Sequence, residues 1–336
     1  MQCYFSFIIP VYNRPGEIQE LLESISVQTF DRTFEVVVVE DGSKDMSKEV
    51  VDSYQGKLNI RYIFKENTGP GDSRNVGMQK AAGDYFLILD SDCVLPPDYL
   101  DNVDKYLQEE YVHCFGGPDT DKKSFTLLQR AINYSLTSPL TTGGIRGGKK
   151  ALTRFQPRSF NMGISSEAFL RSGGFKKIHP GEDPDLVLRL WNLGYLSRLF
   201  PEAKVYHKRR IEAGSFIRQV YKFGLVRAIL NLWHPESQRF VYWLPTLFCA
   251  GIIDLCLYYL LGWSLMATTM AVIYSSYLFL VFLHALSTTK NLLVAFLSPF
   301  TTILQFLGYG YGFIKSTILV NFIKRDPQVA FPQLFF

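Results

Sequence analysis

The distribution of charge along the sequence constrains the fold more than any single motif. From Val241 onward the only charged residues are Asp254, Lys290, Lys315, Lys324, Arg325 and Asp326, whereas the part before Val241 is rich in both signs. Two segments, 242–263 and 265–286, are almost wholly apolar. At 1.5 Å per residue, a helix of about 22 residues crosses a hydrocarbon core of about 30 Å. The sequence therefore predicts a water-soluble body over residues 1–230 and a membrane region with two transmembrane helices over residues 240–323.

Three further segments bear on the membrane region. The hydrophobic stretch 292–323 is interrupted by Pro299 and three glycines, and Lys315, Lys324 and Arg325 follow its first part. The positive-inside rule therefore favours a re-entrant or interfacial segment over a third crossing. Apolar and basic side chains alternate over residues 214–232, which predicts an interfacial helix, with a core-packed helix as the alternative. A basic, glycine-rich stretch at 141–150 is either a solvated linker or a contact for an anionic headgroup or a diphosphate near the bilayer.

The body alternates apolar runs with helical periodicity. The runs 5–11, 34–39, 60–64 and 85–89 predict strands, and segments with helical spacing lie between them. This order predicts an α/β fold whose mainly parallel sheet has helices on both faces.

A net charge of +4 and a pI near 8.6 are too mild to indicate nucleic-acid binding. The first apolar run lacks the basic residues of a secretory signal, so we expect a cytoplasmic body with reduced thiols.

Two carboxylates two residues apart, Asp90 and Asp92, directly follow the apolar run 85–89. Open α/β sheets build their sites at the carboxyl ends of strands. Side chains at this spacing can reach one hard divalent cation. The sequence Asp90-Ser91-Asp92 therefore predicts a clamp for a metal and a diphosphate, although a plain strand-to-turn cap explains the tripeptide alone equally well.

Two further polar groups lie where strands are expected to end. Glu40 and Asp41 end the run 34–39, and an acid at such a position can accept hydrogen bonds from a base or a ribose hydroxyl; a tight turn with a capping serine is the alternative. The stretch 67–77 is a glycine-bearing loop that leads into a helix with Arg74 in its first turn. A helix N-terminus with a guanidinium group suits a diphosphate.

A third acidic group opens a predicted helix at Glu182-Asp183-Pro184-Asp185. Neighbouring carboxylates repel one another and raise proton affinity, as a general base for a sugar hydroxyl requires. Helix capping is the alternative, and both roles can hold for different acids.

His207 ends a short apolar run and is followed by three cations. Its imidazole can complete a Mn²⁺ or Mg²⁺ shell, although a lone histidine is often structural.

Together these motifs resemble one family, the bacterial family 2 inverting glycosyltransferases with a GT-A fold, a Rossmann-like architecture. The resemblance covers about the first 230 residues. It rests on the order and spacing of Phe7-Ile8-Ile9-Pro10-Val11-Tyr12-Asn13, Val38-Val39-Glu40-Asp41-Gly42-Ser43, Gly69-Pro70-Gly71-Asp72-Ser73-Arg74-Asn75, Leu89-Asp90-Ser91-Asp92, Asn161-Met162-Gly163 and Gly181-Glu182-Asp183.

The resemblance implies a role for each matching residue. Asp41 would bind the nucleoside in a pocket lined by Pro10, Tyr12 and Glu40. Arg74 would reach the diphosphate, and Ser91 would lie among the nucleotide-sugar contacts. Asp90 would contact ribose or metal, and Asp92 would hold Mn²⁺ or Mg²⁺. Asp183 would deprotonate the acceptor, with Glu182 as its supporting neighbour. Asn161 and Met162 would contact the donor sugar and the acceptor.

One departure from the family pattern narrows the expected reaction. The Gln-x-x-Arg-Trp signature of processive synthases is absent after His207, where the chain reads Lys208-Arg209-Arg210. We therefore expect transfer of one sugar, from a nucleotide-diphosphate sugar such as a UDP-sugar, to a hydroxyl of a lipid or lipid-linked glycan. The expected location is the inner (cell) membrane, with the catalytic domain on the cytoplasmic side. A polyprenyl-phosphate glycosyltransferase and a non-catalytic scaffold with a nucleotide-binding fold are the alternatives.

Overall fold

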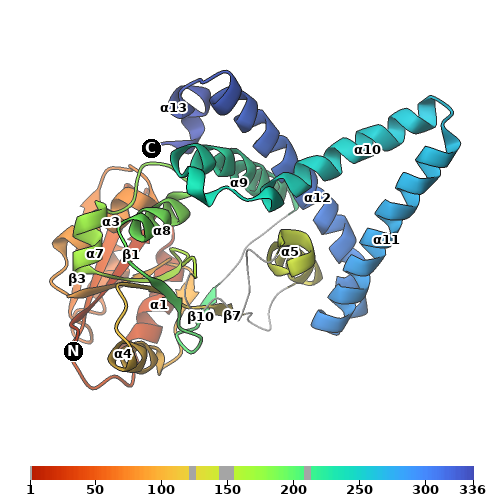
Figure 1. The fold of residues 1–336 in the computed structure, drawn as a ribbon. Helices are drawn as coiled ribbons and strands as arrows, with labels where there is room; N and C mark the ends of the chain where they lie inside the picture. The colour runs from red at the N-terminus through yellow and green to blue at the C-terminus, as the bar shows by residue number, and fades with distance from the viewer. Residues whose placement is uncertain (1, 121–125, 144–154, 208–212) are drawn as a thin grey trace. The chain divides into compact units, whose positions relative to one another are not determined.

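The computed structural model describes residues 2–120, 126–143, 155–207 and 213–336, and the chain forms two compact units (Figure 1). The first unit comprises Met1–Lys123, Lys150–Lys208 and Phe335–Phe336, and the second comprises Ser124–Lys149 and Arg209–Leu334. Most of the predicted basic stretch at 141–150 lies outside the described residues.

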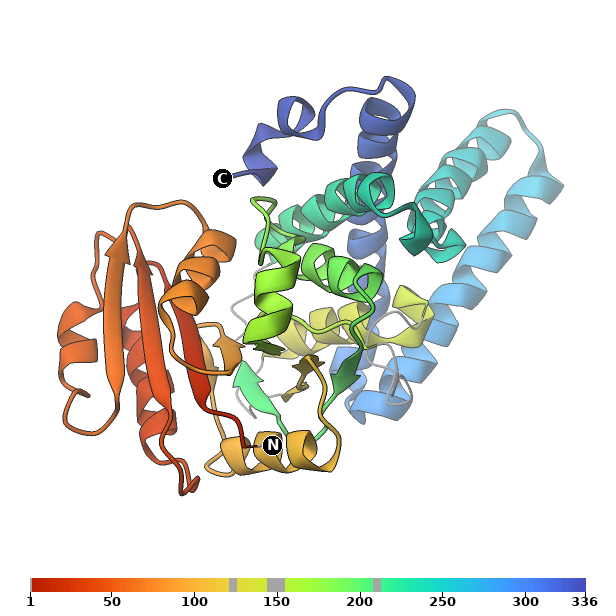
Figure 2. The same ribbon diagram turned by 60° about the vertical axis from the view of Figure 1, so that its left-hand side comes forward.

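The first unit is built on a mixed sheet whose described strands follow the order β3-β2-β1-β4-β8-β6-β9. Parallel pairing joins β1 to β2 and β4, and β2 to β3, so these four strands end at one edge (Figure 2). Strand β8 runs antiparallel to β4 and β6, and β9 is parallel to β6. The prediction of a mainly parallel sheet is confirmed. The strands are β1 (Phe5–Val11), β2 (Glu35–Asp41), β3 (Ile60–Lys65), β4 (Tyr85–Leu89), β6 (Cys114–Gly116), β8 (Asn161–Ser165) and β9 (Ser197–Leu199).

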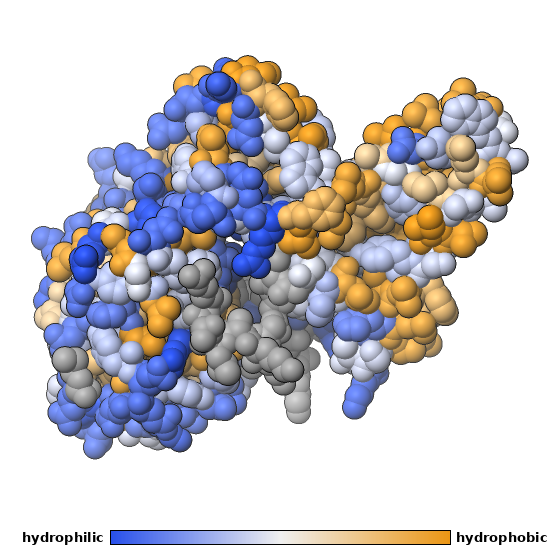
Figure 3. All heavy atoms as spheres, viewed as in Figure 1, coloured by the Kyte–Doolittle hydropathy of each residue, from blue (hydrophilic) through white to orange (hydrophobic). Residues whose placement is uncertain are grey.

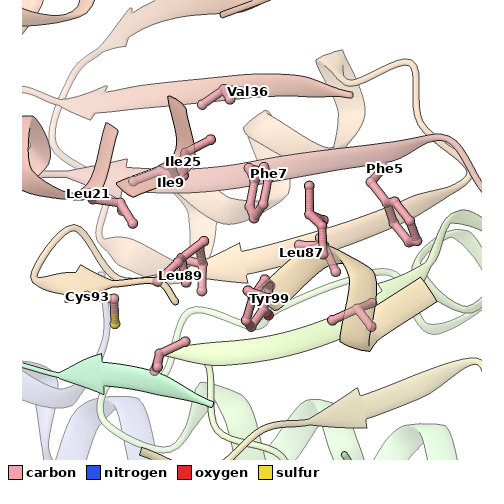
Figure 4. Packing of buried hydrophobic residues seen from close by; sticks show 14 of the residues in the cluster. Phe5, Phe7, Ile9, Leu21, Ile25, Val36, Leu87, Leu89, Cys93 and Tyr99 are labelled. Atoms are coloured by element: carbon pink, nitrogen blue, oxygen red, sulfur yellow. The ribbon is translucent and has the colours of Figure 1, made fainter. Parts of the chain in front are cut away.

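Helices cover both faces of this sheet because successive strand residues point to opposite sides and apolar residues lie on both. Phe7 and Ile9 of β1 pack in one core cluster with residues of α1 and α4, and Ile8 packs in a second cluster with residues of α3, α7 and α8. Figure 4 shows part of the first cluster around Phe7, with Leu87 and Tyr99 beside it. The helices are α1 (Pro15–Ser26), α2 (Lys48–Asp52), α3 (Pro70–Lys80), α4 (Tyr99–Glu109), α7 (Ser166–Ser172) and α8 (Glu182–Asn192).

A small second sheet lies in the same unit, with the order β5-β10-β7. Its strands are β5 (Cys93–Val94), β7 (Asp119–Thr120) and β10 (Val205–His207). Strand β10 runs antiparallel to β5, and in this register the backbone of His207 lies opposite Cys93. The pairing therefore brings His207 beside the segment that carries Asp90 and Asp92, although they are more than a hundred positions apart in the sequence.

The second unit is helical, and three of its described helices are long and apolar enough to cross a membrane: 240–260, 264–289 and 292–322. Figure 3 shows apolar residues gathered along the hairpin of α10 and α11, where many side chains are exposed. The predicted helix 214–232 is present as α9, which packs on α12. The principal helices are α5 (Leu127–Thr137), α6 (Pro139–Thr142), α9 (Ala213–Trp233), α10 (Leu244–Leu260), α11 (Ser264–Thr289), α12 (Leu292–Ser316) and α13 (Pro327–Ala330).

Glycines set the close packing of α9 on α12. A Cβ atom on Gly224 would lie 2.2 Å from the carbonyl oxygen of Tyr309, and one on Gly312 would lie 2.3 Å from that of Tyr221. Only glycine permits backbones to approach so closely. The glycines of the segment 292–323 therefore serve helix packing in this structure.

Helix α12 gives the course of the segment 292–323. It continues through Pro299 and runs into the π-helical turns Thr317–Phe322, so the segment does not reverse as a re-entrant loop would. Neighbouring helices can satisfy the backbone groups that an internal proline leaves unpaired. How this helix and α9 lie relative to a bilayer stays a prediction.

Candidate active site

The carboxyl ends of β1, β2, β3 and β4 meet at one edge of the sheet, and hydrogen bonds join the loops that follow them. The Asn13 side-chain oxygen accepts the Lys44 N–H at 2.8 Å, which joins the loops after β1 and β2. Arg14 donates to Asp92 Oδ2 at 2.7 Å, which joins the loop after β1 to the segment after β4. The sequence-predicted acids at 41, 90 and 92 therefore belong to one connected edge, as the parallel register requires.

Asp41 organises the loop 67–69. Its Oδ1 accepts the Thr68 N–H and its Oδ2 accepts the Gly69 N–H, both at 3.0 Å, and Lys65 Nζ lies 2.5 Å from Oδ1. The residue is only 4% exposed. The carboxylate thus shapes the loop that leads into α3, and its predicted contact with a nucleoside stays a prediction.

Glu40 lies beneath this edge, because its side chain is fully buried. Its carboxylate accepts hydrogen bonds from the hydroxyls of Ser43 and Ser47, from the Ser47 N–H at 2.8 Å and from the Tyr62 hydroxyl at 3.2 Å. Direct contact with a nucleoside, the role implied by the resemblance, would require some of these bonds to break. In this structure Glu40 holds the turn after β2 in place.

Of the other residues predicted to line a nucleoside pocket, Tyr12 is the most accessible. Its side chain is 51% exposed just after β1, whereas Pro10 is half-buried and Ser91 is buried. An exposed aromatic ring at a strand end offers a face on which a base can stack.

Arg74 is the centre of a buried ion-pair network. Its guanidinium donates to Asp90 Oδ1 at 2.7 Å and to Glu182 Oε1 at 3.0 Å, and it lies 5.4 Å from the centroid of the Phe175 ring. Burial alone would lower the pKa of Arg74, but the two carboxylates more than offset it and raise the pKa above its usual value. Arg74 therefore remains charged and joins α3, the end of β4 and the start of α8.

This burial bears on the predicted diphosphate contact. Arg74 is only 3% exposed, and Gly71 in the first turn of α3 packs against Phe175 and Lys176. The α3 N-terminus is thus covered in this structure. Arg74 orients Asp90 and Glu182, and a direct contact with a diphosphate would require this network to open.

Glu182 and Asp183 open α8, and their surroundings shift their proton affinities in opposite directions. Burial favours the neutral form of Glu182, but the hydrogen bond and charge of His179 and the charge of Arg74 outweigh it and lower the pKa to about 2. Burial raises the pKa of Asp183, and the Glu182 charge adds to that effect, while Arg158 at 3.3 Å opposes it. Such a divergence between neighbouring acids is typical of acid–base sites.

Asp185, the third acid of this group, has a structural position. It is fully buried, and its Oδ2 accepts a hydrogen bond from Arg189 Nε at 2.9 Å, one turn further along α8. The acids of this group therefore differ in role. Asp185 stabilises the helix, while Asp183 has an environment suited to a base.

The proposed metal ligands are accessible but paired with arginines. The side chain of Asp90 is 32% exposed and that of Asp92 is 14% exposed, and Arg74 and Arg14 lie 2.7 Å from them. Among the described side chains, no group of three His, Cys, Asp or Glu residues is placed to hold a metal, and the His207 side chain lies outside this description. One or two carboxylates with substrate phosphates suffice for Mg²⁺, so Asp90 and Asp92 fit a cation that arrives with a nucleotide.

Two residues for which the resemblance implies substrate contacts, Asn161 and Met162, are buried in this structure. Met162 is fully buried and packs with Ile88 in the second core cluster. The Asn161 side chain is also fully buried, accepting the Tyr99 hydroxyl at 2.8 Å and donating to the Ala203 carbonyl at 2.7 Å. Strand β8 lies inside the sheet between β4 and β6, and every one of its positions is buried. Neither side chain is accessible in this structure, and the contacts with donor sugar and acceptor that the resemblance implies stay a prediction.

Comparison with known families decides the class of the protein. The model of the family "Glycosyl transferase family 2" matches residues 6–178, about half of the chain. The chain belongs to glycosyl transferase family 2. This confirms the family and the enzyme class predicted from the motifs.

Several known proteins are similar to this family 2 chain. The Staphylococcus aureus protein TarS, a poly(ribitol-phosphate) beta-N-acetylglucosaminyltransferase, is 39% identical over 150 residues, which are 40% of this chain and 26% of TarS. An uncharacterized glycosyltransferase of Rickettsia felis is 38% identical over 104 residues, 31% of this chain and 17% of that protein. The chain thus matches about a quarter or less of the length of these relatives.

A solved structure extends the similarity to the whole fold. The mannosyltransferase PcManGT of Pyrobaculum calidifontis, in complex with GDP-Man and Mn²⁺, superposes with a TM-score of 0.62 at 19% identity, covering 90% of this chain and 88% of that one. This likeness confirms the predicted GT-A fold.

The structure adds four site residues that the motifs did not identify in this family 2 enzyme: Arg14, Lys65, Arg158 and His179. Lys65 could have been found, because β2 and β3 pair in parallel and place it opposite Asp41. Arg14 lies in the turn directly after β1, which is also a recognisable position. Arg158 and His179 lie in irregular segments, where sequence periodicity gives no signal.

Proposed function

We propose that this chain is an inverting glycosyltransferase that moves one sugar from a nucleotide-diphosphate sugar, with UDP as the nucleotide, to a hydroxyl group of a membrane-associated acceptor. The observation that carries the proposal is the pair Glu182 and Asp183. Glu182 is held ionised by Arg74 and His179, while the pKa of Asp183 is raised. A general base works best when its pKa is raised toward the operating pH.

The reaction follows from these residues. Asp183 accepts the proton of the acceptor hydroxyl while that oxygen bonds to the anomeric carbon, and the bond from this carbon to the diphosphate oxygen breaks. The attack is in line with the departing group, so the configuration inverts and no covalent enzyme intermediate forms. Glycosidases differ in placing two carboxylates across the bond that is cleaved.

A divalent cation fits the remaining acids. Asp90 and Asp92 would hold Mn²⁺ or Mg²⁺, with the His207 imidazole as a further ligand. A bound cation would offset the charge that develops on the departing nucleoside diphosphate. The mannosyltransferase PcManGT, which has the same fold, was solved with Mn²⁺, which supports this choice. Asp92→Asn should weaken Mn²⁺ binding, measured by electron paramagnetic resonance of the free ion.

The acceptor is proposed to be a lipid or a lipid-linked glycan. Three helices suited to crossing a membrane support this class, because tethering keeps an enzyme where such acceptors lie. TarS, whose name states a poly(ribitol-phosphate) acceptor, supports a hydroxyl-bearing acceptor in this part of the family. We place the enzyme in the inner (cell) membrane with the catalytic unit facing the cytoplasm, and labelling of engineered surface cysteines in intact cells tests this orientation.

The experiment that tests the reaction separates a hydroxyl acceptor from a phosphate acceptor. In a polyprenyl-phosphate glycosyltransferase, the alternative that the membrane helices also favour, the attacking phosphate carries no proton that a base must remove. Asp183→Asn should therefore lower transfer to a hydroxyl by about 10²- to 10⁴-fold but leave transfer to a lipid phosphate nearly unchanged. Asp45→Asn, the same change at an exposed position after β2, is the control.

The assay measures nucleotide release by the full chain in detergent with Mn²⁺, across a panel of activated sugars and both acceptor types. Wild-type protein that binds neither UDP nor GDP with Mn²⁺ in calorimetry would refute the proposal and favour a scaffold. Full activity of Asp183→Asn on a hydroxyl acceptor would refute the role of the base.

A further inference from the structure

The last two residues of the sequence belong to the catalytic unit, although the chain before them belongs to the helical unit. Phe335 forms an antiparallel bridge with Ile178, and the Phe336 N–H donates to the Lys177 carbonyl at 3.2 Å. This short stretch therefore adds a strand-like pairing to the segment 177–179. That segment leads directly into Glu182 and Asp183.

The Phe336 ring also lies on the loop that Asp41 organises. A Cβ atom on Gly69 would lie 2.5 Å from one carbon of this ring and 2.6 Å from another. Gly69 has φ of +93°, so its backbone conformation and the ring contact both require glycine. The Gly69 N–H is one of the two backbone donors to the Asp41 carboxylate.

The Phe336 ring also approaches His179, with 6.0 Å between the ring centroids. His179 Nδ1 lies 3.1 Å from Glu182 Oε2. One aromatic side chain thus touches the loop that surrounds Asp41 and the segment that holds Glu182. The sequence gap between these two elements is more than a hundred residues. Arg74, in the helix after that loop, also reaches Glu182.

We infer that Phe336 is a positioning residue of the donor site, which fixes the loop 67–69 and the segment 177–179 relative to each other. This inference rests on the proposed function, because it assigns the positioning to the nucleotide-sugar site. The ring is 50% exposed, so its removal should change the local order of these two segments more than the overall stability of the unit.

The first test needs no ligand. Hydrogen–deuterium exchange of the full chain in detergent reports the Thr68 and Gly69 amides that bond to Asp41. Phe336→Ala should speed their exchange by about tenfold, within the range of coupling between neighbouring contacts, whereas Phe336→Leu should retain most of the protection. Leu170→Ala, which truncates an apolar side chain that is 74% exposed on α7, is the matched control.

The second test measures donor binding. Phe336→Ala should weaken UDP binding with Mn²⁺ in calorimetry and raise the KM for the donor by about tenfold. The change in kcat should be smaller, because misplaced donor-binding residues weaken substrate binding more than they slow the chemical step. Phe336→Leu should restore most of the affinity. A residue with a purely structural role would lower the melting temperature and leave the KM of the remaining folded enzyme unchanged.

The outcomes separate the two proposals. Unchanged exchange at positions 68 and 69 in Phe336→Ala, or an equal increase in Leu170→Ala, would overturn the positioning role. Increased exchange with an unchanged donor KM would overturn it as well. Wild-type protein that binds neither UDP nor GDP would instead refute the proposed function, and in that case the exchange experiment still decides whether Phe336 orders the two segments.

Discussion

The most specific prediction concerns Glu182 and Asp183, which are adjacent in sequence but should respond oppositely to neutralisation. Glu182→Gln removes a buried charge that pairs with Arg74 and lies 3.1 Å from His179 Nδ1. Asp183→Asn removes a charge that burial disfavours. Glu182→Gln should therefore destabilise the catalytic unit at neutral pH, and Asp183→Asn should leave its stability unchanged or slightly higher.

The loss of folding stability expected for Glu182→Gln follows from the pKa of Glu182. A fall from the ordinary value of 4.5 to about 2 corresponds to about 3 kcal/mol of stabilisation of the folded state. Removing one partner of a buried ion pair typically costs about 3–5 kcal/mol, which is consistent. For a unit of this size, about 3 kcal/mol lowers the melting temperature by about 6–12 °C.

The direction of each pKa shift decides how the stability changes with pH. Because the folded-state pKa of Glu182 lies below its unfolded value, the stabilisation is fully present above pH 4.5 and is lost as the pH falls through about 2. The difference between wild type and Glu182→Gln should thus shrink to less than about half by pH 3. For Asp183 the pKa is raised, so protonation favours folding, and the wild type should approach Asp183→Asn in stability as the pH falls.

The assay is thermal unfolding of the full chain in detergent, followed by tryptophan fluorescence from pH 7 to pH 3. Subtracting the melting temperature of each variant from that of the wild type at the same pH cancels the effect of the acids that both proteins share. Equal melting temperatures for Glu182→Gln and Asp183→Asn at pH 7, or a Glu182 difference that does not change with pH, would refute the electrostatic assignment of this pair.

Three further variants test other contacts. Arg14→Gln should raise Mn²⁺ affinity about two- to fivefold, because Arg14 pairs with Asp92 at 2.7 Å and a partly exposed pair is worth up to about 1 kcal/mol; lower affinity would contradict this. Glu40→Gln should cost about 1–3 kcal/mol through lost hydrogen bonds and speed exchange of the Ser47 amide. Gly77→Ala should cost about 1–3 kcal/mol, because its Cβ would lie 2.7 Å from Ile8, whereas Gly56→Ala, with open space around it, should be near neutral in thermal unfolding.

The parts of the fold that the sequence predicts correctly are those set by local pattern. Strands β1, β2 and β4 are largely apolar runs and nearly every position in them is buried, so their composition indicates their burial, whereas β3, which carries Arg61, is only partly buried. Helix α3 begins at Pro70, inside the stretch 67–77 that the sequence predicts as a loop leading into a helix, because Gly69 with φ of +93° and a proline in the first turn suit a helix start there. The ends of elements depend on such local backbone details more than on periodicity.

Strand β8 shows where local pattern fails. Its sequence, Asn-Met-Gly-Ile-Ser, mixes polar and apolar residues, yet every position is buried. The burial of Asn161 is possible because Tyr99 and Ala203, both distant in sequence, complete its hydrogen bonds. An unsatisfied amide at this depth would be costly. A motif containing Asn161 and Met162 therefore marks a substrate contact or a buried strand equally well until the partners are known.

The same reasoning explains why the motifs identify the acids of the site but not their charge states. Glu182 and Asp183 are chemically alike in the sequence, and each could serve as base or as support. Arg74 lies 108 positions from Glu182 and reaches it only because α3 and α8 meet beside the end of β4. Arg158 reaches Asp183 from a segment without regular structure. The division between an acid held ionised and an acid with raised proton affinity is thus a property of tertiary contacts, and replacing Arg74 should change the pKa of Glu182 while the motif itself stays intact.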